Sequence, residues 1–115
     1  MELTYKDAGG LRMVEIADTR IDAAVAISFK DQMRELSDDA PNRIVLDLTN
    51  VAFLDSSGLG AIVAAMKQVG TGRKLELAGL TPTVQKVFTL TRMDTVFTIH
   101  PDMDTALGGG LANAS

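Results

Sequence analysis

The middle of the chain reads Val45-Leu46-Asp47-Leu48-Thr49-Asn50-Val51-Ala52-Phe53-Leu54-Asp55-Ser56-Ser57-Gly58-Leu59-Gly60, and this stretch decides the fold. The apolar run from Ile44 to Leu48 is short and β-branched, which is typical of a buried strand. After a short connection come an acid, two hydroxyls and a glycine, and then apolar residues at helical spacing, namely Leu59, Ile62, Val63 and Met66. Ser56 and Ser57 are therefore predicted to lie where a helix begins.

The start of this helix allows two interpretations. The first N–H groups of a helix have no partner inside it, and a side-chain oxygen can cap them. The same N–H groups and the helix dipole also favour a phosphate. Asp55-Ser56-Ser57-Gly58 is therefore either an ordinary cap or, in addition, a phosphorylation switch in which a phosphoryl group adds about −1.5 to −2 charges.

Composition limits the function. A chain of 115 residues with 46 % hydrophobic residues suits one domain with one core. The net charge of −4, the missing basic cluster and 4 % aromatic residues disfavour binding to nucleic acid or to an anionic membrane. Without cysteine there is no thiolate chemistry, and the acids lack metal-ligand spacing. We expect no metal. With no signal pattern and no apolar run long enough for a bilayer, a cytoplasmic location is expected.

The first half of the chain predicts a hairpin, a helix and a strand. Two strands, Leu3–Lys6 and Leu11–Ile16, flank Gly9-Gly10, which favours a turn, and Asp18-Thr19-Arg20 is predicted to be a loop. A helix is predicted from Asp22, with Asp22 as its N-cap, Ile21 as a hydrophobic staple, and Val25, Phe29, Met33 and Leu36 on one face. The central strand is predicted over Arg43–Leu48.

The second half continues the alternation. The helix from about Ser57 is predicted to end at Gly70, and Lys74–Ala78 alternates like a half-exposed strand. Thr81-Pro82 predicts a helix start, Thr95–Ile99 a further strand, and Pro101 the beginning of a short last helix with Met103, Ala106 and Leu107. We expect one domain over residues 1–108 and a flexible tail over 109–115.

This order predicts an α/β fold: a mixed, mostly parallel sheet with about four helices. In such sheets ligands and partners bind at the carboxyl ends of the strands. The loop Asp55–Gly58 follows the central strand and lies at such an end. The site is therefore expected there.

Enzymatic readings of this loop fail on spacing. A serine triad needs a base, but the only histidine is His100, expected at the surface or at a strand end, and neither serine lies in a G-x-S-x-G elbow. Gly58 and Gly60 do not complete a dinucleotide fingerprint, because Val63 occupies the third position. The segment 70–74 fails the phosphate-loop spacing. We therefore expect no enzyme, no catalytic residue and no cofactor.

The same residues carry a resemblance to a known family. Ile44–Leu48 followed by Asp55-Ser56-Ser57-Gly58-Leu59-Gly60 closely resembles the STAS domain of bacterial anti-sigma factor antagonists, and the resemblance covers roughly Leu3 to Leu107. It implies a STAS-like α/β domain that binds an anti-sigma factor with serine kinase activity. The kinase would phosphorylate Ser56, releasing the complex, and a PP2C-like serine phosphatase would reset it.

The resemblance also implies a binding surface, with Asp22, Asp55, Ser56, Ser57, Gly58 and Leu59 as its partner-binding residues. Ser57 is expected to cap the helix, Gly58 to admit a partner's backbone, and Gly60 to let the helix pack against a neighbour; alternatively both glycines only lower helix propensity. Many family members carry a Gly-x-Leu-Asp-type turn where this chain has Thr19-Arg20-Ile21-Asp22, so partner specificity can differ. The competing function is a STAS scaffold or regulatory subunit of a transport or lipid-trafficking complex, without phosphorylation.

Overall fold

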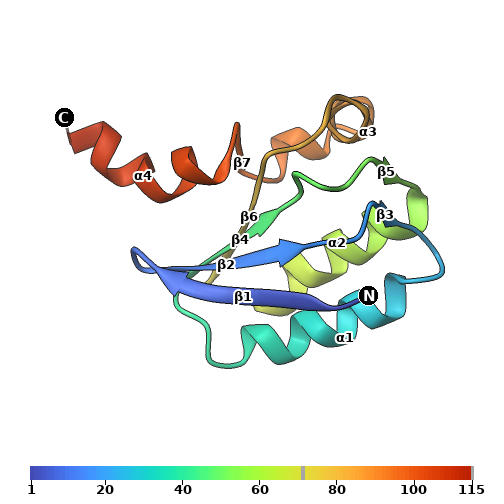
Figure 1. The fold of residues 1–115 in the computed structure, drawn as a ribbon, viewed down its shortest axis with the longest axis horizontal. Helices are drawn as coiled ribbons and strands as arrows, with labels where there is room; N and C mark the ends of the chain where they lie inside the picture. Colours follow the sequence, from blue (N-terminus) through green and yellow to red (C-terminus); the bar gives the residue numbers. More distant parts are fainter. Residues whose placement is uncertain (71, 115) are drawn as a thin grey trace.

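The structure is a computed structural model that describes residues 1–70 and 72–114, with side chains up to residue 108. These residues form seven strands and four α-helices (Figure 1). The strands are β1 Leu3–Ala8, β2 Leu11–Ile16, β3 Arg20–Ile21, β4 Arg43–Asp47, β5 Phe53–Leu54, β6 Lys74–Ala78 and β7 Ile99–His100. The helices are α1 Ala26–Ser37, α2 Ser56–Val69, α3 Pro82–Leu90 and α4 Met103–Ala114, with a 3₁₀ turn at Met93–Thr95.

The main sheet has the order β1-β2-β4-β6-β7. β1 and β2 form the predicted antiparallel hairpin, whose turn uses Gly9 and Gly10 at positive φ, and the other neighbours are parallel. The mixed, mostly parallel sheet with four helices confirms the predicted fold class.

The two faces of the sheet are covered unequally. α1 and α2 lie together on one face, and α4 lies on the opposite side of the sheet (Figure 1). The larger core cluster joins Phe29 and Met33 of α1 and Ile62 of α2 to the strands. A small second cluster, Leu11, Val45, Ala78 and Ala106, lies under α4. The strands in the middle of the sheet are therefore apolar on both faces, as parallel strands usually are.

Several predicted boundaries are wrong. Arg20, at the end of the predicted loop 18–20, and Ile21 form β3, which pairs in parallel with β5 in a second, two-stranded sheet. A strand over Thr95–Ile99 reduces to the 3₁₀ turn and the two residues of β7. The last helix runs to Ala114 and is therefore longer than the short helix predicted. The domain boundary at residue 108 stays a prediction. The expected flexibility of residues 109–115 stays a prediction.

β6 was predicted to be half exposed, but Leu75–Ala78 are all buried. The carboxylate of Glu76 is accommodated by polar side chains on the two neighbouring strands. Arg43 of β4 binds it through two hydrogen bonds of 2.8 Å, and Nε2 of His100 on β7 lies 2.6 Å from Oε1. His100, expected at the surface or at a strand end, is at a strand end but mostly buried in this cluster.

The hydrogen-bond partners of Glu76 favour the ionised form of its carboxyl group. Burial alone would raise the pKa of the carboxyl, but the hydrogen bonds from Arg43 and His100 outweigh burial and lower the pKa below its usual value of 4.5. Arg43 also donates to the carbonyl oxygen of Ala106, so the cluster ties α4 to the sheet. Three strands and one helix therefore meet at a single ionised carboxylate.

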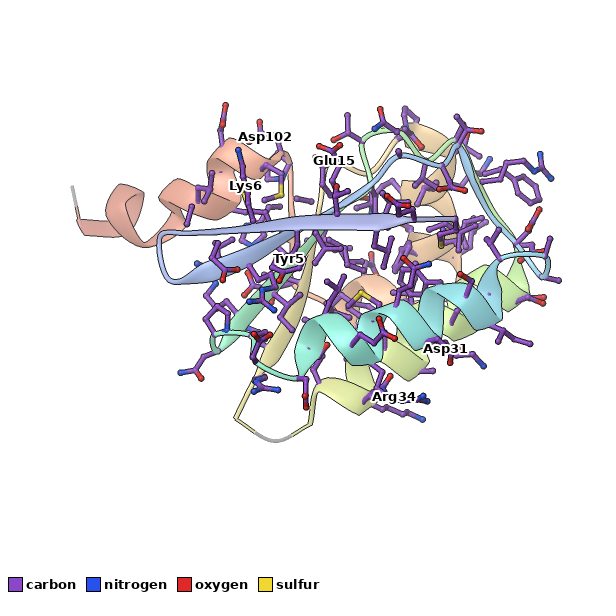
Figure 2. All side chains as sticks on the ribbon, turned by 60° about the horizontal axis from the view of Figure 1, so that its bottom comes forward. Tyr5, Lys6, Glu15, Asp31, Arg34 and Asp102 are labelled. Carbon is purple, nitrogen blue, oxygen red and sulfur yellow. The ribbon has the colours of Figure 1, made fainter. Side chains whose placement is uncertain are left out.

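Replacing Arg43 by methionine should destabilise the domain by leaving the Glu76 charge without its main partner. Removing one partner of a buried pair costs about 3–5 kcal/mol, and we expect about 2 kcal/mol because Arg43 is partly exposed. Urea unfolding measures the change. Arg34→Met is the control, since Arg34 pairs with Asp31 at 3.7 Å on the surface of α1 (Figure 2), where such pairs contribute about 0–1 kcal/mol. Equal losses in both variants would contradict the assignment.

The lowered pKa of Glu76 also predicts a pH dependence. The folded state favours the ionised form, so the stabilisation is fully present above pH 4.5 and is lost as pH falls through the lower folded-state pKa. The difference in unfolding free energy between the wild type and Glu76→Gln should therefore shrink as the pH is lowered below about 4.5. Urea titrations across this range measure it, and a constant difference would contradict the prediction.

Candidate functional site

The predicted site lies at the start of α2, and Asp55 is its N-cap. Oδ1 of Asp55 accepts a hydrogen bond from the amide of Gly58 at 2.8 Å, and the amide of Leu59 donates to the Asp55 carbonyl at 2.9 Å. Ser56 and Ser57 are the first two helical residues, and both are exposed. The expectation that Ser57 caps the helix is wrong, because the carboxylate one position before the serines takes that role.

The small sheet of β3 and β5 brings Asp22 to the same end of the molecule. β3 pairs with β5 immediately before Asp22 and Asp55, and the amide of Asp55 donates to the Ile21 carbonyl at 3.5 Å. Asp22 is not the N-cap of α1, whose cap is Val25; its carboxylate instead accepts from the amide of Ala24 at 3.1 Å. A turn at residues 22–25 thus separates β3 from α1, and the helix begins at Ala26 and not at Asp22 as predicted.

Gly58 is buried at the contact between α2 and β3. A Cβ atom there would collide with the carbonyl oxygen of Ile21 and would lie 2.8 Å from both the Ile21 carbonyl carbon and Cδ1 of Leu54. A close backbone approach at this glycine is therefore already made within the chain, and a role of Gly58 in partner binding stays a prediction. Gly58 positions the two serines by fixing α2 against β3.

Gly60 has the opposite environment. It is exposed, and a Cβ atom there would meet nothing within 4 Å, so the expected packing of the helix against a neighbour through Gly60 is not observed. Leu59 between the two glycines is half-buried and packs against the larger core cluster. Of the predicted binding residues, Ser56 and Ser57 are therefore the most accessible, Asp22, Asp55 and Leu59 are partly accessible, and Gly58 is internal.

An aromatic residue of this surface was missed in the sequence. Phe53 of β5 is exposed, and the guanidinium of Arg20 on β3 lies 4.1 Å from its ring centroid. Arg20 also contacts the carboxylate of Asp22 at 3.4 Å. The signal available was an apolar aromatic two residues before the acid, but two-residue strands have too little periodicity to reveal the pairing.

Further hydrogen bonds fix the segment between β4 and β5 that leads to the site. The hydroxyl of Thr81, predicted as a helix cap, donates to the Val51 carbonyl at 2.8 Å and so ties the start of α3 to the segment before β5. At the end of β4, the Asp47 carboxylate accepts from the amide and the hydroxyl of Thr49. Contacts with β3, with the start of α3 and within the turn after β4 thus fix the backbone around the site.

The described residues offer no cluster of three or more metal-ligating side chains. His100 belongs to the Glu76 cluster and not to the α2 start, so the serines have no histidine base. None of the helices in the described part of the chain has the length and apolar character needed to cross a membrane.

The fold and the site define a small α/β domain whose candidate site is an exposed helix start, not an enclosed cavity. Residues 3–106 match the family model of the STAS domain, and the chain belongs to this family. It is 26 % identical to the anti-sigma-F factor antagonist RsfB of Mycobacterium tuberculosis over 107 residues, which cover 93 % of this chain and 87 % of that protein.

Solved structures agree. An anti-sigma factor antagonist from Mycobacterium paratuberculosis superimposes with a TM-score of 0.83 at 26 % identity, covering 94 % of this chain and 92 % of that one. SpoIIAA, an anti-sigma factor antagonist in its unphosphorylated form, matches with a TM-score of 0.74 at 16 % identity over 96 % and 97 % of the two chains. The second likeness shows the fold alone.

Substitution by alanine should change the stability of the domain in opposite directions at Gly58 and at Gly60. Gly58→Ala should destabilise the domain by about 2 kcal/mol or more, because the new Cβ overlaps the Ile21 carbonyl and the backbone must shift. Gly60→Ala should stabilise it by about 0.5–1 kcal/mol, because the methyl meets open space in a helix interior. Thermal and urea unfolding of the two variants measure both effects, and two changes of the same sign would contradict this account.

Proposed function

We propose that the protein is an anti-sigma factor antagonist of a partner-switching pathway. In its unphosphorylated form it would bind an anti-sigma factor that is also a serine kinase, and so free the sigma factor. Phosphorylation of Ser56 would release the complex, and a PP2C-like phosphatase would restore the binding form. The observation that carries the proposal is Ser56 itself, exposed as the first residue of α2 beside the Asp55 cap in a STAS domain whose relatives include anti-sigma factor antagonists.

The geometry favours a local switch. At the first position of α2, the helix N-terminus would stabilise a phosphate by about 0.3–1 kcal/mol. The neighbouring Asp55 carboxylate, held in place by the Gly58 amide, opposes it by a similar amount at the surface. Because the two effects nearly cancel, phosphorylation should leave the stability of the domain almost unchanged.

Phosphorylation would instead lower the affinity at the interface with the partner. A surface that accepts a neutral hydroxyl must then hold a dianion, and unfavourable charge contacts across an interface cost several kcal/mol. A penalty of about 3–4 kcal/mol corresponds to several hundredfold in affinity. This is enough to release a partner without refolding the domain.

Gly60 supports binding beside Ser56. The two residues are four positions apart on α2 and therefore share one helix face. Glycine in a helix costs about 1 kcal/mol relative to alanine, and within the described part of the chain nothing lies within 4 Å of the position that a Cβ would take. We attribute the glycine to close approach of the partner at this face, with Phe53, Asp22 and Leu59 at its border.

Substitutions at Ser56 should separate binding from folding. Ser56→Asp and Ser56→Glu should keep the wild-type circular dichroism spectrum and nearly the same melting temperature, yet bind the anti-sigma factor about a hundredfold or more weakly. Ser56→Ala should bind like the wild type and should not be released by kinase and ATP. Calorimetry with the anti-sigma factor measures the affinities.

Ser57→Asp is the matched comparison: it places the same charge on the next exposed residue of the helix and should weaken binding less than Ser56→Asp does. Mass spectrometry after incubation with kinase and ATP should place the phosphate on Ser56. Phosphate on Ser57 alone would refute the site. Equal affinity of all Ser56 variants would refute the switch and favour a STAS scaffold or a regulatory subunit that does not depend on phosphorylation.

A further inference from the structure

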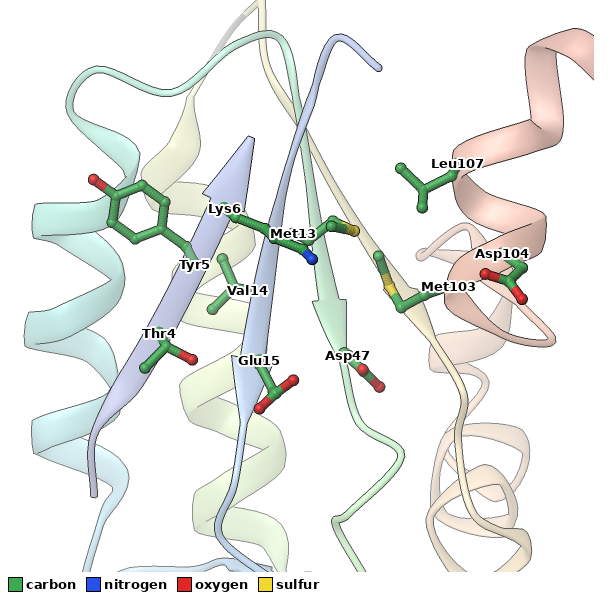
Figure 3. Close-up of a pocket in the computed structure, with 10 residues that line it drawn as sticks. All are labelled: Thr4, Tyr5, Lys6, Met13, Val14, Glu15, Asp47, Met103, Asp104 and Leu107. Atoms are coloured by element: carbon green, nitrogen blue, oxygen red, sulfur yellow. The ribbon is translucent and has the colours of Figure 1, made fainter. Parts of the chain in front are cut away.

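A groove of about 400 Å³ lies on the face of the sheet opposite α1 and α2. Its walls are β1, β2 and β4 on one side and α4 on the other (Figure 3). None of the residues proposed above for partner switching lines it. The groove is therefore a feature separate from the Ser56 site.

The groove exists because α4 covers only part of this face. α4 lies mainly over β4 and β7 and meets the beginning of β2 at Leu11. Beyond Leu11 this face of β1 and β2 is open, and Thr4, Lys6 and Glu15 are exposed there. Two neighbouring strands span about 10 Å, and packed helices lie about 8–10 Å apart. The uncovered strip thus has the width of one further helix beside α4, whereas the opposite face carries α1 and α2 packed together.

The floor and one wall of the groove are apolar. Met13 of β2 and Met103 and Leu107 of α4 are half-buried and pack against the small core cluster under α4. In Figure 3 the side chains of Met13, Met103 and Leu107 point into the space between β2 and α4. Methionine side chains adapt to differently shaped apolar partners, and Met-rich grooves suit amphipathic helices.

The charged side chains at the groove are mostly acidic. Glu15, Asp47 and Asp104 contribute three carboxylates, against the single ammonium of Lys6 (Figure 3). Glu15 and Asp104 form no ion pair within the described part of the chain. Asp47 is held at the groove by hydrogen bonds from Thr49. An occupant with basic groups would therefore find charges of the opposite sign that are not already neutralised.

Together these observations favour one occupant. We propose that the groove docks a basic amphipathic helix of a partner protein, lying beside α4. Its apolar side would cover Met13, Met103 and Leu107, and its lysine or arginine side chains would face Glu15, Asp47 and Asp104. A second copy of this chain fits less well, because its net charge is −4. The site would be independent of the Ser56 surface, so a partner there could stay bound while the switch operates.

The test uses the full-length protein and two model helices. The probe is a labelled peptide of about 18 residues with leucine at helical spacing and lysine on the flanking positions, and its counterpart carries glutamate for every lysine. Fluorescence anisotropy should show the lysine peptide binding at least tenfold more tightly than the glutamate peptide. Amide shifts on binding should fall on β1, β2 and the start of α4.

Charge reversal provides the matched controls. Glu15→Lys should weaken binding of the lysine peptide at least tenfold, because it places a like charge in the groove. Glu35→Lys, on an exposed position of α1, changes the net charge equally and should alter affinity less than twofold. Ser56→Asp should bind the peptide as the wild type does, which separates this proposal from the switch.

Other outcomes would overturn the proposal. Equal weakening by Glu15→Lys and Glu35→Lys would mean attraction to the overall charge alone. Spermidine that displaces the peptide and binds as tightly would make the groove a site for free amines. Sedimentation that shows a dimer of the wild-type chain, dissociated by Glu15→Lys, would make it a contact between copies.

Discussion

The start of α2 depends on one steric constraint, the contact between Gly58 and the carbonyl of Ile21. The contact brings the helix so close to β3 that only a residue without a side chain fits. It also sets the pairing of β3 with β5, since the same Ile21 carbonyl accepts from the amide of Asp55. The positions of Asp22, Asp55 and both serines follow from this packing.

A second constraint is the burial of both faces of the central strands. Leu46 and Leu77 face the larger core, while Val45 and Ala78 face α4, so the middle of the sheet has little room for polar groups. Glu76 is the exception, and Arg43 and His100 satisfy it from the two neighbouring strands. A carboxylate satisfied from both sides fixes the relative positions of these strands more specifically than apolar packing does. The same cluster attaches α4, and therefore also shapes the groove.

Much of this fold could be predicted from the sequence, because long periodic segments carry strong signals. The hairpin at Gly9-Gly10, the strand at Ile44, the helix after Asp55 and the Thr81-Pro82 helix start were all predicted in the right order. The two-residue strands were not, because pairing of that length depends on tertiary contacts. The Glu76 cluster was missed for a related reason: alternation in 74–78 suggested a solvent-facing side, and only the position of β7 shows that Glu76 is covered.

For the candidate site too, local patterns predicted the helix start but not the contacts of each residue. Its location at a helix start followed from local chemistry, but the assignment of roles within it required the fold. Ser57 was given the capping role that the structure assigns to Asp55, and the internal packing of Gly58 was not predicted. What remains unexplained by the folding of the chain is its exposed part: Ser56, Gly60 and Phe53 contribute little to the core, and Gly60 weakens its own helix. Gly60 weakens its helix and Phe53 exposes apolar surface that Arg20 covers on one side only, and both lie within four positions of Ser56, which is why we propose binding at this surface.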